Sequence, residues 1–392
     1  MPFILRKALK ESNQLGMVLA FGQLSVLEIC SVFQGAALKA ETPCERVAVL
    51  QTDRQITDDL GRIAGIHKCA PLTIAEGGGR TDAREFVEVL CRYLEEKSNF
   101  AVSGYGLDAT EYEALVRILL DGIRDAGLRK VRLLRPRNNE LLSEEILKRE
   151  ALDVMAFPYH DGIALGPTAW VPDSTSMRSR GVGRPVPRSE ISLSPRLART
   201  LINLAGLQSG EALLDPFCGS GTILAEAFTE SLYCIGFDSS AARVHETVRN
   251  LRWLGALEGT SFHVRKGDAR DLKRSLRGSK VDGVVTEPVL LPAFEARPKT
   301  ATAEELVNNA GEVYSRALDS MADSVRRGGR IVVVVPVIQT MDGEEVVLSL
   351  DARELGLRLY QPGPVGFEYP VRLSFETTRW VRRAVYVFES PL

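Results

Sequence analysis

The sequence lacks most of the features that would assign it at once to a class of protein. Its six cysteines show no C-x-x-C spacing and its four histidines are scattered, so neither a zinc site nor a disulfide framework is indicated. We interpret the cysteines as small buried hydrophobes. The longest apolar run, Ile331 to Ile338, is far shorter than the roughly 18 residues of a membrane span, and the N-terminus lacks the apolar core of a signal peptide. These absences predict a cytoplasmic protein with no membrane partner and no metal.

The chain also lacks an overall charge that would select a partner. Forty-nine basic side chains against 51 acidic ones give a net charge of −2, so a nucleic-acid partner has to be argued from local clusters. A content of 45% hydrophobic and 26% charged residues is ordinary for a globular protein. At about 150 residues per domain, 392 residues predict two or three domains. Nothing in the sequence speaks to oligomeric state, and a monomer is the default.

The N-terminal half reads as two successive α+β units. Residues 1–75 alternate the apolar runs MVLAF, SVLEICSVFQG and RVAVL with turns, which predicts a small first module. Residues 76–171 continue with a helix from Ala83 after the turn cluster GGGRTDA, a strand in NFAVSGYG, a helix in YEALVRILLDGIRDAG and two β-like runs, LDVMAFPY and DGIALGPTAWV. The segment from Pro172 to Arg188 has no periodicity and is predicted to be a connecting loop within a linker over residues 172–193.

Residues 194–392 alternate strands and helices in a different way. The runs LLD, YCIGFD, SFHVRKGD, VDGVVTEP and RIVVVVPV are separated by helical segments, which predicts a parallel sheet covered on both faces, with ligands at the carboxyl ends of the strands. The last segments, LRLYQPGPVGFEYPVRLSF and RWVRRAVYVF, predict an antiparallel hairpin added to the sheet edge. The expected fold class is therefore α/β, with a doubly wound domain following N-terminal α+β units.

A glycine-rich turn follows the first strand of the C-terminal part, in the order Asp215-Pro-Phe-Cys-Gly-Ser-Gly-Thr222. Glycines at a strand-to-helix turn let a ligand approach the backbone closely, and the helix N-terminus offers free N–H groups. The turn lacks the G-x-G-x-x-G of dinucleotide folds and the lysine of nucleoside triphosphatases. It resembles the first motif of S-adenosylmethionine-dependent methyltransferases that act on exocyclic amines of nucleobases. That resemblance implies that the cofactor lies against Asp215, Phe217, Gly219, Gly221 and Thr222, with Asp215 holding its amino group.

Two further acids end the next two strands. Asp238 closes YCIGFD and could accept hydrogen bonds from both ribose hydroxyls. Asp268 closes FHVRKGD, and the same resemblance implies that it faces the adenine amine. Each alone is equally typical of a strand-end cap or a turn. Three carboxylates at successive strand ends argue for one crevice, because the carboxyl ends of parallel strands converge.

The fourth strand ends in Thr286-Glu287-Pro288-Val289-Leu290. Methyltransferases of the group that the glycine turn resembles carry Asp, Asn or Ser there, then two prolines and an aromatic. A side-chain oxygen and the carbonyl of the first proline can accept the N–H groups of a poorly nucleophilic amine and aim its nitrogen at the methyl group. The resemblance implies that Glu287 and Pro288 are the catalytic pair.

The same strand end departs from that pattern. Glutamate is one methylene longer than aspartate, and Val289 and Leu290 replace the second proline and the aromatic ring that would stack on the extracted base. Tyr360, Phe367 and Tyr369 could supply a substitute ring or be packing residues. The sequence leaves open whether transfer activity is retained or lost.

Two segments are locally basic. Residues 121–137 hold six basic side chains against two acidic ones, and residues 177–199 hold six arginines against one glutamate. Clustered arginines can neutralise phosphates, although a solvated basic face is the alternative. The predicted RNA-contacting residues are Arg129, Lys130, Arg132, Arg135, Arg137, Arg178, Arg180 and Arg184.

The order of units along the chain resembles the THUMP-containing tRNA guanosine N2-methyltransferase family. The resemblance is carried by FAVSGYG and VRLLRPRNNELLSEEIL in the second unit and by GRPVPRSEISLSPRLARTLINLAG before the glycine turn. It implies a ferredoxin-like module over 1–75, a THUMP domain over 76–171, a linker over 172–193 and a Rossmann-like methyltransferase domain over 194–392. It also implies S-adenosyl-L-methionine as cofactor, tRNA as partner and guanosine N2 as target. A catalytically silent tRNA-binding protein and a DNA or protein methyltransferase remain alternatives.

Overall fold

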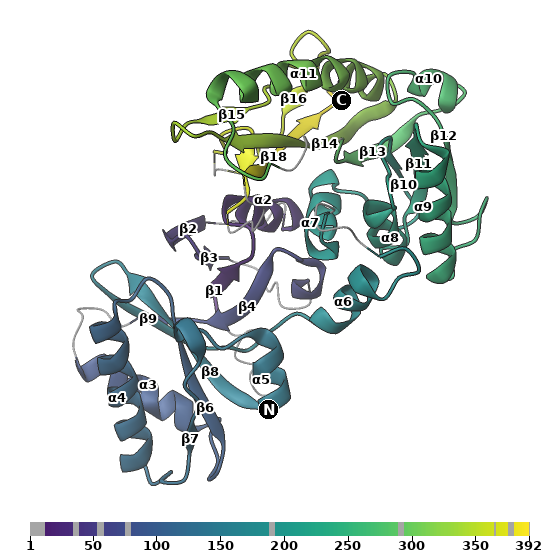
Figure 1. Ribbon diagram of the computed structural model, residues 1–392. Coiled ribbons are helices and arrows are strands. Elements are labelled where there is room, and N and C mark those ends of the chain that lie inside the picture. Colours follow the sequence, from purple (N-terminus) through teal and green to yellow (C-terminus); the bar gives the residue numbers. More distant parts are fainter. Residues whose placement is uncertain are drawn as a thin grey trace.

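The computed structural model describes residues 12–33, 39–52, 59–74, 80–187, 193–288, 294–363, 366–374 and 380–391. Within these residues the strands form three sheets, of four, five and nine strands. Figure 1 shows the four-stranded sheet between the other two. No helix in the described part of the chain is long and apolar enough to cross a membrane.

The first sheet is antiparallel and is formed by the early apolar runs. Its strands lie in the order β2-β3-β1-β4, and helix α2 packs beside them. The elements are β1 (Gln14–Leu19), α2 (Gln23–Val32), β2 (Lys39–Cys44), β3 (Val47–Gln51), a short 3-10 helix (Leu60–Arg62) and β4 (Ile66–Pro71).

The second sheet has the order β5-β9-β8-β6-β7 and carries helices of its own. Helix α4 begins where the Asp108 side chain accepts hydrogen bonds from the N–H groups of Thr110 and Glu111, and its apolar side chains at Leu115 and Leu119 pack into the core of this unit. The elements are β5 (Thr73–Ile74), α3 (Arg80–Cys91), β6 (Asn99–Gly104), α4 (Ala109–Asp125), β7 (Arg132–Leu133), a 3-10 helix (Arg137–Asn139), α5 (Ser143–Arg149), β8 (Ala151–Tyr159) and β9 (Gly162–Pro167).

The prediction of a loop from Pro172 to Arg188 is wrong over half of its length, because α6 (Ser174–Val182) lies within it. The Asp173 side chain accepts a hydrogen bond from the N–H of Thr175 and caps this helix. Gly181 is its one buried residue, so the helix has no apolar face. A helix without an apolar stripe leaves no periodic signal in a sequence.

The third sheet runs β12-β11-β10-β13-β14-β18-β16, and its first five strands are parallel. The predicted antiparallel addition is confirmed, since β18 pairs antiparallel with β14, β16 and β17. Apolar clusters cover both faces, with α7 and α8 on one and α11 on the other. The strand order reverses between β10 and β13, which is where doubly wound sheets bind ligands. The predicted α/β class is therefore confirmed.

The bounds of this part follow the predicted alternation of strands and helices. They are α7 (Pro195–Ala205), β10 (Ala212–Asp215), α8 (Thr222–Thr229), β11 (Tyr233–Asp238), α9 (Ala241–Trp253), β12 (Phe262–Lys266), α10 (Leu272–Ser275), β13 (Val281–Thr286), α11 (Thr300–Ala322), β14 (Val325–Gln339), β15 (Glu345–Val347), β16 (Arg358–Leu359), β17 (Val371–Arg372) and β18 (Val381–Glu389).

Helix α2 of the first sheet shares an apolar core with α7 of the third-sheet unit. At this contact Glu28 is fully buried and accepts hydrogen bonds from the N–H groups of Ala64 and Gly65 and from the Asn203 amide on α7, at 2.6–2.9 Å. The guanidinium of Arg196 donates to the carbonyl of Ala64 at 2.7 Å. The first sheet is therefore fixed to the third-sheet unit by a shared core and a buried polar network.

A second buried network joins the first and second sheets. Lys68 on β4 and Asp153 on β8 are fully buried, and their charged groups lie 2.9 Å apart. Asp153 also accepts hydrogen bonds from Ser103 at 2.6 Å and from Thr168 at 2.8 Å. Separating the two side chains would leave each with an unpaired buried charge, which is costly. This contact therefore fixes how the two sheets pack against each other.

Three late aromatic residues and four of the six cysteines are buried or packed against the core. Tyr360 and Phe367 are 6% and 8% exposed within the apolar core, and Tyr369 packs against it, so their role as packing residues is confirmed. Cys30, Cys69, Cys218 and Cys234 are buried as predicted, whereas Cys44 and Cys91 are partly exposed.

Candidate active site

The glycine turn joins the end of β10 to the start of α8, and its two glycines have different roles. Both have left-handed backbone conformations, with φ of 54° at Gly219 and 82° at Gly221. A Cβ at Gly221 would collide with Thr247 on α9 at 2.8 Å, so this glycine is needed for packing. Among the described residues a Cβ at Gly219 would meet only the Phe217 carbonyl, at 3.9 Å, so this part of the chain leaves the backbone there open to a ligand.

Asp215 connects β10 to β13, the two strands between which the strand order reverses. It is 1% exposed, and its Oδ1 accepts hydrogen bonds from the Thr286 hydroxyl at 2.7 Å and from the Phe217 N–H at 3.2 Å. Burial, with smaller contributions from the negative charges of Asp238 and Glu287, raises the pKa of Asp215 to about 7. The end of β10 therefore carries an acid that changes its charge near neutral pH.

Asp238 lies against the glycine turn from the end of β11. Its carboxylate accepts hydrogen bonds from the N–H of Gly219 at 3.0 Å and from the N–H of Ser240 at 2.8 Å. The side chain is partly exposed, and a carboxylate offers about four acceptor positions, so two contacts do not exhaust it. The structure thus brings Asp215, Gly219 and Asp238 together.

The hydrogen bonds of Asp268 are made within its own turn. It is exposed, and its two oxygens accept hydrogen bonds from the Arg270 guanidinium at 2.6 and 2.9 Å. Hydrogen bonds from Arg270 hold the pKa of Asp268 at about 2. Among the described residues its carboxylate bonds within its own turn, so a role toward adenine stays a prediction.

Glu287 follows β13 directly and is held by a residue that the sequence did not single out. Its Oε1 accepts a hydrogen bond from the Nε–H of Arg383 at 2.6 Å, and the two side chains are 13% and 5% exposed. Pro288 is buried beside it. The departures at Val289 and Leu290 lie outside the described residues.

Helix α9 fastens the glycine turn with two side chains that the sequence analysis missed. The Thr247 hydroxyl donates to the Gly219 carbonyl at 2.7 Å, and the Asn250 amide donates to the Ser220 carbonyl at 2.8 Å. Their i, i+3 spacing on the buried face of a helix after the second acidic strand is the local signal that could have found them. Arg383 has no such signal, because 96 positions separate it from Glu287.

The predicted RNA-contacting residues divide into an exposed group and an inward-facing group. Five lie exposed between the end of α4 and the 3-10 helix after β7, at the edge of the second sheet, and Arg178 on α6 is exposed as well. Arg180 instead donates to the buried Glu226 at 2.6 Å. Arg184 is 4% exposed and donates to Thr222 and Ser220 of the glycine turn, at 3.0 and 3.1 Å. The exposed five are Arg129, Lys130, Arg132, Arg135 and Arg137.

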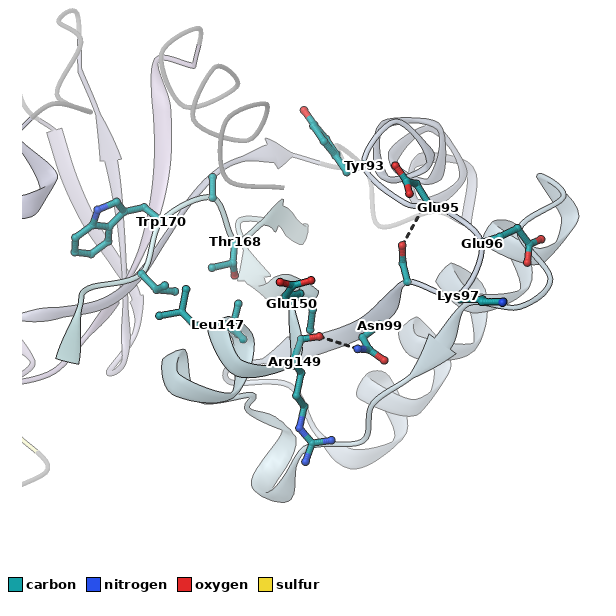
Figure 2. A pocket seen from close by; sticks show the side chains of 15 residues that line it. Tyr93, Glu95, Glu96, Lys97, Asn99, Leu147, Arg149, Glu150, Thr168 and Trp170 are labelled. Carbon is teal, nitrogen blue, oxygen red and sulfur yellow. Dashed lines mark hydrogen bonds between the residues drawn. The ribbon is translucent and has the colours of Figure 1, made fainter. Parts of the chain in front are cut away.

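A cavity of about 630 Å³ lies elsewhere, in the second unit. Figure 2 shows Tyr93, Asn99, Arg149 and Trp170 around it, with the Asn99 amide donating to the Arg149 carbonyl at 2.7 Å. All of its lining residues fall between positions 93 and 171, so it shares none with the glycine turn.

Comparisons with known proteins agree with this geometry. Residues 186–343 match the RMKL-like methyltransferase domain family. A curated relative from Methanothermococcus thermolithotrophicus, named a probable tRNA (guanine(10)-N2)-dimethyltransferase, is 36% identical over 124 residues, which are 31% of this chain and 74% of the relative. The chain belongs to this methyltransferase family.

A second curated relative and a solved structure also match. The tRNA (guanine(10)-N2)-dimethyltransferase of Methanothermobacter thermautotrophicus is 36% identical over 145 residues, which span 37% of this chain and 39% of that protein. The structure of TrmN from Thermus thermophilus matches 96% of this chain and 99% of its own, with a TM-score of 0.54 at 18% identity. Its likeness confirms the Rossmann-like methyltransferase fold.

Proposed function

We propose that this protein methylates the N2 amine of a guanosine in tRNA, in the cytoplasm, with S-adenosyl-L-methionine as methyl donor. The observation that carries the proposal is the hydrogen bond between Asp215 and Thr286, which places the glycine turn beside Glu287 and Pro288 at the switch point of the sheet. The names of the curated relatives support the choice of tRNA and of the guanine N2 amine.

The residues at the turn fit the methyl donor. Open backbone at Gly219 and the carboxylates of Asp215 and Asp238 suit a ligand with an ammonium group and ribose hydroxyls. When bound, S-adenosyl-L-methionine supplies an electrophilic methyl group on a sulfonium. Phe217 and Thr222 complete the turn, and Asp268 at the third strand end is the proposed partner of adenine.

Glu287 and Pro288 act on the acceptor. The Glu287 carboxylate and the Pro288 carbonyl accept the two N–H bonds of the guanine amine and hold its lone pair toward the methyl group. A buried position favours this role, because hydrogen bonds in a water-excluded site are stronger than in water. The base has to leave its stack to arrive there, at a cost of a few kcal/mol.

The N-terminal sheets deliver the RNA in this proposal. We assign residues 1–75 to a ferredoxin-like module, 76–171 to a THUMP domain, 172–193 to a linker and 194–392 to the methyltransferase domain. The exposed basic edge around β7 supports the assignment of RNA binding to the second sheet, since arginine and lysine clusters neutralise phosphates.

The test is methyl transfer from labelled donor to tRNA, ribosomal RNA, DNA and protein offered separately, followed by nucleoside analysis of the product. We expect label in tRNA alone, as N2-methylguanosine or its dimethyl form. Glu287→Ala should abolish transfer and leave donor binding nearly intact, whereas Asp238→Ala should weaken donor binding about tenfold or more.

Asp351→Ala is the matched control, because Asp351 pairs with Arg353 in an exposed turn of the same domain and should change neither property. Label in DNA or protein would contradict the proposed substrate. Retained tRNA binding without any transfer would identify a silent RNA-binding protein, and undiminished turnover in Glu287→Ala would remove that residue from the mechanism.

A further inference from the structure

Arg383 reaches Glu287 across an intervening strand. It lies on β18, Glu287 follows β13, and β14 runs between them. In the strand register Arg383 is opposite Pro336 of β14, and Thr286 is opposite Val333 of the same strand. Neighbouring strands lie about 4.8 Å apart, so two long side chains have to close a gap of about 10 Å between β13 and β18.

The extra methylene of glutamate contributes to closing that gap. An aspartate at position 287 would be shorter by one carbon–carbon bond, about 1.5 Å. The observed 2.6 Å contact between Arg383 Nε and Glu287 Oε1 would then be lost without a backbone shift. Glu287, the residue that departs from the family pattern, therefore has a hydrogen-bond partner in this chain that an aspartate would not reach.

The acidic groups around Glu287 make the positive charge of Arg383 important for the ionisation of Glu287. Glu287 lies close enough to the buried Asp215 on β10 and the buried Tyr314 on α11 to raise the pKa of both. Two carboxylates in one water-poor site oppose each other's ionisation. A guanidinium keeps its charge at all physiological pH values, so Arg383 favours the ionised form of Glu287.

We propose that Arg383 is a positioning residue for methyl transfer: it fixes the head of Glu287 and keeps it a charged hydrogen-bond acceptor for the substrate amine. This inference rests on the proposed function. Arg383 acts through Glu287, whose carboxylate is a group that can accept several hydrogen bonds at once.

The experiment compares Arg383→Gln, Arg383→Lys and the control Arg382→Gln in steady-state kinetics with tRNA. Arg382 lies next to Arg383 on β18, is exposed and lies 3.9 Å from Glu345. We expect kcat to fall about 100-fold in Arg383→Gln, with KM for tRNA and the donor dissociation constant within about twofold of wild type. Arg383→Lys should recover part of kcat, because it keeps the charge without the planar donor geometry, and Arg382→Gln should resemble wild type.

The pH dependence of kcat separates positioning from a structural role. In Arg383→Gln the acidic limb should move to higher pH, because Glu287 without its cation is protonated more easily. Asp215 titrates in the same range and Tyr314 faces the pair from α11, so Glu287→Gln is measured alongside to identify the limb that does not belong to Glu287.

The double variant Glu287→Gln/Arg383→Gln keeps the inference testable if Arg383→Gln folds poorly, since it removes both buried charges. It should be no slower than Glu287→Gln alone. A kcat within twofold of wild type in Arg383→Gln, or a fully additive loss in the double variant, would overturn the inference alone. A wild-type protein that transfers no methyl group would overturn the proposed function as well.

Discussion

Asp215 is the residue at which the fold and the proposed chemistry make opposite demands. Burial raises its pKa to about 7 from an ordinary value of 3.8, so the folded chain binds more protons than the unfolded chain between these pH values. Its contribution to stability is therefore greatest at acidic pH and falls as pH rises through that window. A bound ammonium group needs the ionised form, so ligand binding should drive the proton off.

We expect the affinity for S-adenosylhomocysteine, which keeps the ammonium group, to rise with pH between 6 and 8. The slope should approach about tenfold per pH unit well below the pKa and level off above it. Asp215→Asn should bind more weakly, with no such slope, because an amide does not titrate in this range. Titration calorimetry at several pH values measures both.

Asp351→Asn serves as the control, because Arg353 holds the pKa of Asp351 at about 2 and that carboxylate is ionised throughout the range. It should leave the pH dependence unchanged. A wild-type affinity that is constant from pH 6 to 8 would contradict the assignment of Asp215 to the ammonium group.

The helices α6, α7 and α8 are joined through a single buried acid. Glu226 on α8 is 1% exposed, lies 2.6 Å from the Nε of Arg180 on α6 and 3.6 Å from the nearest guanidinium nitrogen of Arg199 on α7. Arg199 also pairs with the partly exposed Glu230. Helix α6 is therefore fixed to α8, the helix that begins at the glycine turn.

Removing Glu226 should destabilise the methyltransferase domain strongly. Glu226→Ala leaves two nearly buried guanidinium groups without this partner, and breaking a buried pair in this way costs about 3–5 kcal/mol. Calorimetric unfolding should show a transition lowered by several degrees. Glu230→Ala, which removes a more exposed partner of Arg199, should cost less than about 1 kcal/mol. Equal losses of unfolding free energy in the two variants would show that Glu226 stabilises the contact between the helices no more than Glu230 does.

At the scale of the whole molecule, the exposed basic edge and the candidate active site lie far apart. Figure 1 shows the second sheet with β7 at one end, the nine-stranded sheet at the other and the first sheet between them. Shared cores and the buried Lys68–Asp153 pair join neighbouring sheets. A ligand that touches both ends has to be a large folded molecule, which a tRNA is and a free nucleoside is not.

Replacing Arg132 and Arg135 together by glutamine should weaken tRNA binding several-fold at low salt. The slope of the logarithm of affinity against the logarithm of salt should fall by about 1 to 2, because up to two phosphate contacts are lost. Filter binding over a salt series measures both quantities. Donor binding should not change, since the two arginines belong to the second sheet unit.

Two controls accompany that pair of substitutions. Arg353→Gln changes a guanidinium of the methyltransferase domain that is 88% exposed and should leave the affinity and slope unchanged. A short hairpin that presents only the target guanosine should be insensitive to the Arg132 and Arg135 changes. Unaltered tRNA binding by the double variant would remove this edge from the RNA interface.

The sequence by itself determined the features that depend on neighbours along the chain. The alternation of strands and helices, the glycine turn and the acids that end β10 and β11 are local patterns, and the structure places Asp215 and Asp238 beside the turn as those patterns indicate. Parallel strands of one sheet end at one edge, so local strand ends translate directly into a shared crevice.

Only the tertiary structure decided which charges pair. Arg180 and Arg184 read as members of a basic surface, yet both are turned inward, because an ion pair forms between groups that are close in space whatever their separation in sequence. Arg383 meets Glu287 across a strand for the same reason, and Glu28 is buried between the first sheet and α7. Packing of distant segments sets these contacts, and no periodicity or motif encodes them.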